Sequence, residues 1–307
     1  MQSVNECFHK VKNDCFKYIY SQETKTEKFK NKEKMLRSYL IPLSFWIANK
    51  KKNKSKTLIL GLSGGQGTGK TTITTIISII LRKYFNKKTF VISIDDFYKT
   101  IKERYKLSKN IHPLLQTRGV PGTHDVNIIL NFFRKLNTNN FKPISLPKFD
   151  KSIDDRIKKN KWHKLKKKPD IVILEGWCVG AKPQTNKQLI KPVNLMEKNA
   201  DTSAKWRKYV NFQLKTKYKK LYSQLKSVIY LKTPSFNLSR SWRIKQEKKL
   251  KTKKTINSKI MTNKEVIRFM MTYERLTLQM FKDMPKISKA VLSLNKFHQI
   301  NGLRLVS

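Results

Sequence analysis

The feature that most constrains the fold is the stretch "GLSGGQGTGKTT" at residues 61–72. It follows the apolar run "TLILGL" and precedes "TTITTIISIILRKYF", whose length and apolar spacing predict a helix. The pattern G-x-x-x-x-G-K-[ST] is satisfied by Gly64, Gly69, Lys70 and Thr71. Between a strand and a helix, this pattern indicates a loop that binds nucleoside triphosphates.

The residue types of this loop suit a polyphosphate. Glycines let consecutive backbone N–H groups point inward at phosphate oxygens, and the helix N-terminus adds partial positive charge. Lys70 is predicted to reach the β- and γ-phosphates, and the Thr71 hydroxyl is predicted to bind Mg²⁺. The predicted nucleotide-binding residues are Gly64, Gly65, Gln66, Gly67, Thr68, Gly69, Lys70, Thr71 and Thr72.

Strand and helix patterns alternate along most of the chain. Apolar runs predict strands at 57–62, 89–94, 170–176, 227–232 and 289–294. Helical spacing predicts helices at 71–85, at 124–136 with Asp125 as N-cap, and at 263–281, the last stopped by Pro285. Such alternation is typical of an α/β fold, a parallel sheet covered by helices on both faces. Residues 1–56 are predicted to form a helical extension.

Acidic residues follow two of the predicted strands. The second strand leads into Asp95 and Asp96, and a carboxylate there can accept the proton of an attacking hydroxyl. Neighbouring strand positions point to opposite faces, so only one of the two can act as base. Glu175 ends the third strand and is predicted to hold Mg²⁺. A guanine-reading "NKxD" motif does not occur in the sequence, which favours a small-molecule kinase over a switch GTPase.

The charge of the chain is extreme but does not by itself indicate a function. The formal net charge is +48, from 68 Lys and Arg against 20 Asp and Glu. The lysines occur in every segment, without a nucleic-acid-binding signature, which favours a compositional bias over specific nucleic-acid binding. A nucleic-acid-associated ATPase is the alternative from another class. Short apolar runs, three cysteines without metal spacing and no secretory signal predict a cytoplasmic protein without a membrane span.

Several further motifs resemble those of the D-glycerate 3-kinase family of P-loop kinases, relatives of uridine kinase, phosphoribulokinase and pantothenate kinase. The resemblance covers about residues 36–301 and includes "SIDDFY", "RGVPGTHD", "LPKFDKSIDDR", "EGWCVGAKPQ", "KWRKYVNFQL", "SWRIKQE" and "EVIRFMMTYERLTLQM". It implies the P-loop NTPase fold with five parallel strands, a kinase domain at 57–301, a mobile lid at about 234–262, and ATP with Mg²⁺. It also implies that Asp95 is the base and that Arg243 is the lid arginine. The chain departs from the wider pattern at Gln246 and Glu247, where relatives carry arginine and aspartate.

The resemblance implies an acceptor-site region at residues 97–160 and D-glycerate, or a similar small hydroxy acid, as acceptor. A carboxylate is best held by a guanidinium, and hydroxyls suit carboxylate or imidazole partners. The candidate acceptor-binding residues are Arg118, His124, Asp125, Lys151 and Arg156. A uridine- or pantothenate-type acceptor is the closest alternative.

Overall fold

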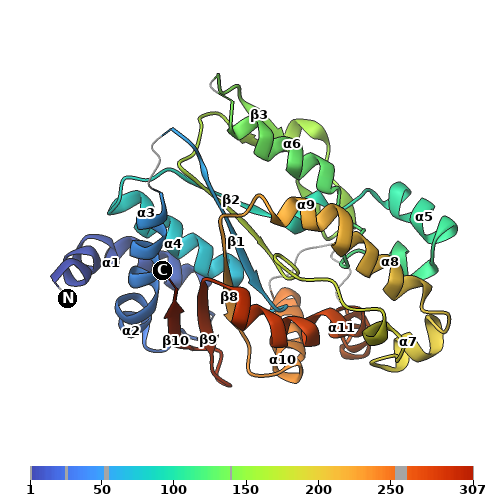
Figure 1. Cartoon of the computed structure of the whole chain (residues 1–307). Helices are drawn as coiled ribbons and strands as arrows, with labels where there is room; N and C mark the ends of the chain where they lie inside the picture. Colours follow the sequence, from blue (N-terminus) through green and yellow to red (C-terminus); the bar gives the residue numbers. More distant parts are fainter. Residues whose placement is uncertain (1, 25–26, 52–54, 139, 253–260, 307) are drawn as a thin grey trace.

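A six-stranded sheet forms the centre of the molecule, and the computed structural model describes residues 2–24, 27–51, 55–138, 140–252 and 261–306 (Figure 1). The strand order across the sheet is β10 (Ile300–Leu305), β9 (Ala290–Leu294), β8 (Ser227–Lys232), β1 (Leu58–Gly64), β7 (Ile171–Gly176) and β2 (Thr89–Ser93). The five strands from β9 to β2 are parallel, as predicted. This order brings the carboxyl ends of β1, β2 and β7 to one edge, where ligands of such sheets bind.

The sixth strand, β10, was not predicted. It pairs antiparallel to β9 at the sheet edge, and its register shifts between Ile300 and Gly302. An edge strand with one exposed side needs little apolar sequence, and "INGLRL" has only a weak alternation. Two small hairpins lie outside the sheet and are formed by β3 (Ile144–Leu146) with β6 (His163–Leu165), and by β4 (Phe149–Asp150) with β5 (Asp155–Arg156).

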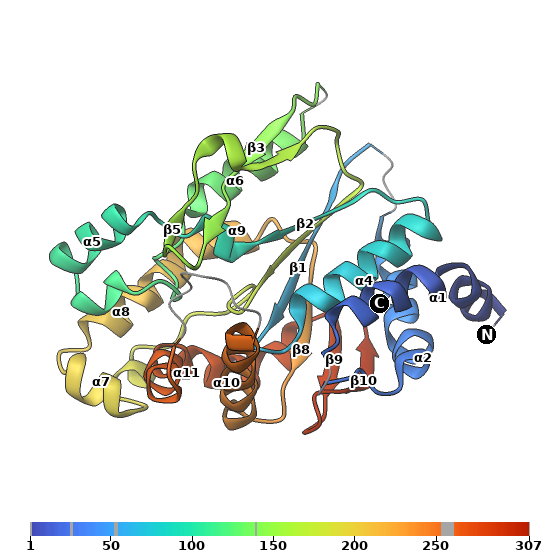
Figure 2. The same cartoon turned by 180° about the vertical axis from the view of Figure 1, so that it is seen from behind.

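Helices cover both faces of the sheet (Figures 1 and 2). One face carries α1 (Gln2–Gln22), α2 (Lys32–Met35), α3 (Ile41–Lys50) and α4 (Lys70–Lys83). The other carries α6 (Val126–Leu136), α8 (Lys205–Gln213), α9 (Lys219–Tyr222) and α11 (Asn263–Ile287). The remaining helices are α5 (Ile101–Asn110), α7 (Leu195–Ala200) and α10 (Phe236–Thr252). Successive side chains of β1 point to opposite faces of the sheet. Leu58 and Leu60 pack in the core under α1 and α4, and Ile59 packs in the core under α6 and α11.

The helices that precede β1 share a core with the kinase fold. Cys7, Val11 and Cys15 of α1 are fully buried and belong to one cluster with Ile73 and Ile77 of α4. α1 packs directly against α4, the helix that follows the phosphate loop. The extension therefore braces the helix that carries Lys70.

The prediction that Pro285 stops the last long helix is wrong. α11 continues to Ile287, with Pro285 inside its final turn, and the Ser288 N–H donates to the Met284 carbonyl at 2.9 Å. Proline removes one helical hydrogen bond, but the buried side chains of Met280 and Met284 hold the turn on the core. Packing thus outweighs the local preference.

The predicted lid is described only in part. Residues 253–260 lie outside the described residues, between α10 and α11.

Among the helices that the structure describes, every one is too short or too polar to cross a membrane.

Candidate active site

The phosphate loop joins β1 to α4, and Lys70 is the first residue of α4. Its Nζ donates to the carbonyls of Gly64 and Gly65 at 3.0 and 2.9 Å, so the side chain curls over the loop. Burial lowers the pKa of the Lys70 ammonium, opposed by the charges of Glu175 and Asp95. The sheet edge thus brings one lysine and two carboxylates from three elements together.

The first half of α10 lies directly against this loop. Gly67 has a φ of 73°, and a Cβ there would lie 3.1 Å from the Trp242 carbonyl carbon and 3.2 Å from the Arg243 nitrogen. Only glycine combines that backbone conformation with such a close approach. The Arg243 guanidinium forms an ion pair with Glu247 and donates to Gln246 at 3.1 Å, and its Nε is buried without a partner among the described residues. Arg243 therefore lies beside the loop, with its charge held within α10.

The two aspartates after β2 face different parts of the molecule. They lie in a 3₁₀ turn at Ile94–Phe97, where successive side chains are about 120° apart. Asp96 accepts the Phe149 N–H at 3.2 Å and faces the small hairpins. Asp95 is the one whose charge acts on Lys70. The geometry thus separates the two carboxylates, with Asp95 on the phosphate side.

The surroundings of Asp95 are strongly polar. Oδ1 accepts from the Tyr98 hydroxyl at 3.0 Å, and Oδ2 lies 2.8 Å from Nζ of Lys151. Burial alone would raise the pKa of Asp95, but the Lys151 ammonium and its hydrogen bond hold it well below its usual range. Asp95 is therefore ionised at neutral pH.

Glu175 at the end of β7 and Thr71 in α4 fit a magnesium site. The Thr71 hydroxyl donates to Oε1 of Glu175 at 3.2 Å, and Oε2 is buried without a hydrogen-bond partner among the described residues. Burial raises the pKa of Glu175, so a cation beside it would relieve an unfavourable buried charge. In the described ranges, no group of three or more His, Cys, Asp or Glu could hold a metal ion.

His124 lies next to Asp95 in a buried position. Its Nδ1 is 2.6 Å from the Tyr218 hydroxyl oxygen, and its ring stacks on Tyr98 with centroids 4.4 Å apart. Burial lowers the pKa of His124 to about 4, although the charge of Asp95 opposes this. The imidazole is therefore neutral, and its buried Nε2 has no partner within the part of the chain that the structure describes.

The three remaining acceptor candidates lie around the same turn. Arg118 forms an ion pair with Asp154, and its charge acts on the phenols of Tyr98 and Tyr273. Arg156 donates to the Tyr98 carbonyl at 2.7 Å and lies 3.5 Å from Asp125, whose own N–H donates to Phe97 O at 2.7 Å. Arg156 and Asp125 thus hold the backbone of the turn that carries Asp95, and Arg118 is paired with Asp154.

Three tyrosines of the site were not predicted from the sequence. Tyr98 binds Asp95, Tyr218 binds His124, and Tyr273 lies against Gly119 and packs edge-on to Trp177 at 4.6 Å. Tyr98 follows Asp95 by three residues, a spacing that could have indicated contact in a turn. Tyr218 and Tyr273 come from distant helices, and the sequence carries no local signal for them.

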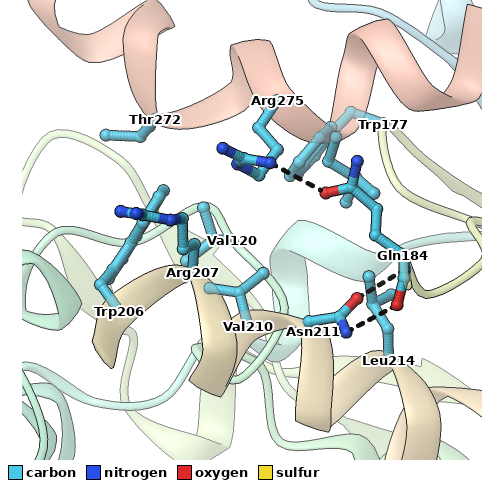
Figure 3. Close-up of a pocket in the computed structure, with 11 residues that line it drawn as sticks. Val120, Trp177, Gln184, Trp206, Arg207, Val210, Asn211, Leu214, Thr272 and Arg275 are labelled. Carbon is cyan, nitrogen blue, oxygen red and sulfur yellow. Dashed lines mark hydrogen bonds between the residues drawn. The ribbon is translucent and has the colours of Figure 1, made fainter. Parts of the chain in front are cut away.

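A pocket beside this site lies between α8 and α11 (Figure 3). Gln184 and Asn211 are joined there by two hydrogen bonds of 2.6 and 3.0 Å, and Arg275 donates to Gln184 at 3.4 Å. Trp177 and Val120 connect the pocket to the loops at the sheet edge. Arg207 binds Asp201 and the carbonyls of Leu189 and Ile190 instead, and the Trp206 indole N–H is buried without a partner among the described residues. The Gln184 contacts therefore link α8 to α11.

Gly119 lies against Tyr273, and a substitution at Gly119 tests the packing between them. It has a φ of 141°, and an added Cβ would lie 2.7 Å from Cζ of Tyr273. Gly119→Ala is therefore expected to destabilise the fold by about 1–3 kcal/mol and to lower kcat/KM, because Tyr273 must move. Thermal unfolding and steady-state kinetics measure both effects. Gly302→Ala is the matched control, since its Cβ would meet Ser293 at an ordinary 3.5 Å. Equal stability of the two variants would contradict the packing described.

Comparisons with known proteins agree with this geometry. No protein-family model matches the chain. It is 33% identical over 230 residues to an uncharacterized kinase, mug58, of Schizosaccharomyces pombe, covering 72% of this chain and 80% of that protein. It is 28% identical over 195 residues to the chloroplastic D-glycerate 3-kinase of Arabidopsis thaliana, covering 56% of this chain and 42% of that protein.

A solved structure shares the fold. D-glycerate 3-kinase from Cryptococcus neoformans superposes with a TM-score of 0.68 at 24% identity, over 87% of this chain and 96% of that one. The relatives and the strand–loop–helix geometry together support ATP-dependent phosphoryl transfer to a hydroxyl. The chain belongs to the same family of P-loop kinases as mug58 of Schizosaccharomyces pombe, and D-glycerate 3-kinase is among its relatives.

Proposed function

We propose that the protein phosphorylates D-glycerate, or a closely similar small hydroxy acid, with MgATP as donor. The observation that carries this proposal is the charge around Asp95. Lys151 lies 2.8 Å from this carboxylate, and the charge of Arg118 acts on the phenol of Tyr98, which donates to Asp95. A cationic surface beside the base suits an acceptor that carries its own carboxylate.

The donor side of the reaction follows from the loop. Its backbone amides and Lys70, which curls over the loop, would bind the β- and γ-phosphates, and Thr71 and Glu175, which are hydrogen-bonded to each other, would hold the metal ion. Mg²⁺ bound there would neutralise charge on the bridging phosphate oxygens. Arg243, beside Gly67, adds positive charge when α10 and the loop close on the nucleotide. These contacts align the γ-phosphorus with the carboxyl end of β2.

The acceptor side places a hydroxyl against Asp95. The hydroxyl oxygen attacks the γ-phosphorus, the bond to the β-phosphate oxygen breaks and ADP leaves with its electron pair. The hydroxyl proton passes to Asp95. Arg118 binds the acceptor carboxylate, and the neutral His124 binds a second acceptor oxygen through Nε2. Arg156 and Asp125 support the turn that carries the base.

A coupled assay of ADP formation tests the acceptor. Purified protein with MgATP is offered D-glycerate, uridine, pantothenate, a polynucleotide or no acceptor, and D-glycerate is expected to give the highest kcat/KM. Turnover with uridine or pantothenate instead would reassign the acceptor, and turnover that requires polynucleotide would overturn the proposal.

Arg118→Met tests the carboxylate contact. Loss of a charged hydrogen bond of about 1.5–3 kcal/mol is expected to raise KM for D-glycerate by about 10–100-fold and to leave KM for ATP nearly unchanged. Arg134→Met, on the exposed side of α6, removes the same charge away from the site and is expected to change neither constant. An unchanged KM for D-glycerate in Arg118→Met would refute the contact.

A further inference from the structure

Both carboxylate oxygens of Asp95 are already occupied. Tyr98 donates to Oδ1 at 3.0 Å, and the Lys151 ammonium donates to Oδ2 at 2.8 Å. A carboxylate bound to a lysine is a poor proton acceptor, because the pair stabilises its ionised form. This arrangement therefore disfavours protonation of Asp95, and the departure of one of the two donors would make the carboxylate a better proton acceptor.

Lys151 is the donor that can leave. It follows Asp150 at the end of β4, and its side chain is 61% exposed, whereas Tyr98 is 2% exposed and stacked on His124. A long, exposed side chain in the turn after a two-residue strand moves at little cost, whereas a buried phenol does not. Lys151 is therefore the donor expected to leave Asp95.

The Lys151 ammonium lies at the sheet edge that also carries the phosphate loop. Glu175 of β7 pairs in register with Leu62 of β1, which leads into the loop, and with Ser93 of β2, which leads into Asp95. Lys151, 2.8 Å from Asp95, thus lies at the same edge as the base, the phosphate loop and the carboxylate beside the metal position. This is the region that the γ-phosphate must enter to meet the acceptor.

The other cations at this edge are held more firmly. Arg118 is paired with Asp154, and Arg243 is paired with Glu247. Arg156 binds two backbone carbonyls in addition to Asp125. Among the described residues around Asp95, Lys151 is the exposed cation that donates a hydrogen bond to the base itself.

We propose that Lys151 is a catalytic residue that moves from Asp95 to the γ-phosphoryl oxygens when MgATP binds. The proposal rests on the kinase function above. The move frees Oδ2 of Asp95 to accept the hydroxyl proton and places positive charge on the group being transferred. Bonds break and form as in the transfer step above, and Lys151 keeps its proton throughout.

The test compares Lys151→Met with Lys151→Arg and with Lys148→Met, an exposed lysine before the same hairpin. Titration calorimetry measures Kd for MgATP and MgADP without any acceptor. Lys151→Met is expected to lower the preference for ATP over ADP by about tenfold, since only ATP carries the γ-phosphate. With D-glycerate as acceptor, kcat of Lys151→Met is expected to fall by about 10²–10³-fold. Lys151→Arg keeps the positive charge, so its kcat is expected to stay within about tenfold of the wild type.

Lys148→Met is expected to behave like the wild type in both measurements. An unchanged ATP preference in Lys151→Met would overturn the proposal, and so would a kcat within threefold of the wild type. The calorimetric measurement needs no acceptor, so it stays informative even if D-glycerate is not the substrate. Wild-type turnover with D-glycerate tests the proposed function separately.

Discussion

Asp95→Asn is expected to lower kcat by about 10²–10⁴-fold, the range for loss of a general base. The amide cannot take the proton of the acceptor hydroxyl, and it cannot form the charged pair with Lys151. KM for ATP is expected to change little, because the nucleotide phosphates are held by the loop and Lys70. Steady-state kinetics with both substrates varied separate these effects.

Asp96→Asn is the matched control for this variant. It removes the same charge from the neighbouring position of the same turn, but Asp96 accepts a hydrogen bond from Phe149 in the direction of the hairpins. An asparagine oxygen can keep that bond, so less than a tenfold loss of kcat is expected. Equal losses in the two variants would mean that Asp95 has no special role.

Lys70→Ala is expected to lower kcat by about 10²–10³-fold and to weaken ATP binding, because one cation contacts both the β- and γ-phosphates. The fold should persist, since burial already disfavours the charged form of Lys70 and its hydrogen bonds go to loop carbonyls. Circular dichroism and thermal unfolding check this. Calorimetry measures the loss of ATP affinity.

Lys83→Ala, in the last turn of the same helix, controls for the lost charge. Lys83 is paired with Asp14 at 3.2 Å on the surface, and its loss is expected to leave kcat and ATP affinity within about twofold of the wild type. Wild-type ATP affinity in Lys70→Ala would contradict the assigned role of the loop.

Much of the fold could be predicted from local patterns. The five parallel strands are short and apolar and each is followed by a turn or helix signal, so period and length alone place them. β10 was not predicted, because half-exposed edge strands have weak apolar patterns. The end of α11 was predicted wrongly, because the rule that proline stops a helix considers only the local sequence, whereas the buried methionines near Pro285 belong to the core.

The candidate site divides in the same way. Lys70, Thr71 and Asp95 lie in continuous motifs whose chemistry depends on spacing along the chain. The contacts of these residues join distant parts of the chain. Lys151 binds Asp95 across 56 residues and Thr71 donates to Glu175 across 104, and such contacts arise only when distant elements pack. The sequence therefore indicates the candidate reactive groups, and the fold determines which side chains pair with them.

The fate of the γ-phosphate tests the central claim most directly. Purified protein is incubated with MgATP and D-glycerate, and the reaction is followed by ³¹P NMR with Asp95→Asn in parallel. The account predicts a new phosphomonoester signal that grows in step with ADP in the wild type and is nearly absent in the variant. Release of inorganic phosphate alone, at a rate that neither the acceptor nor Asp95→Asn changes, would contradict it.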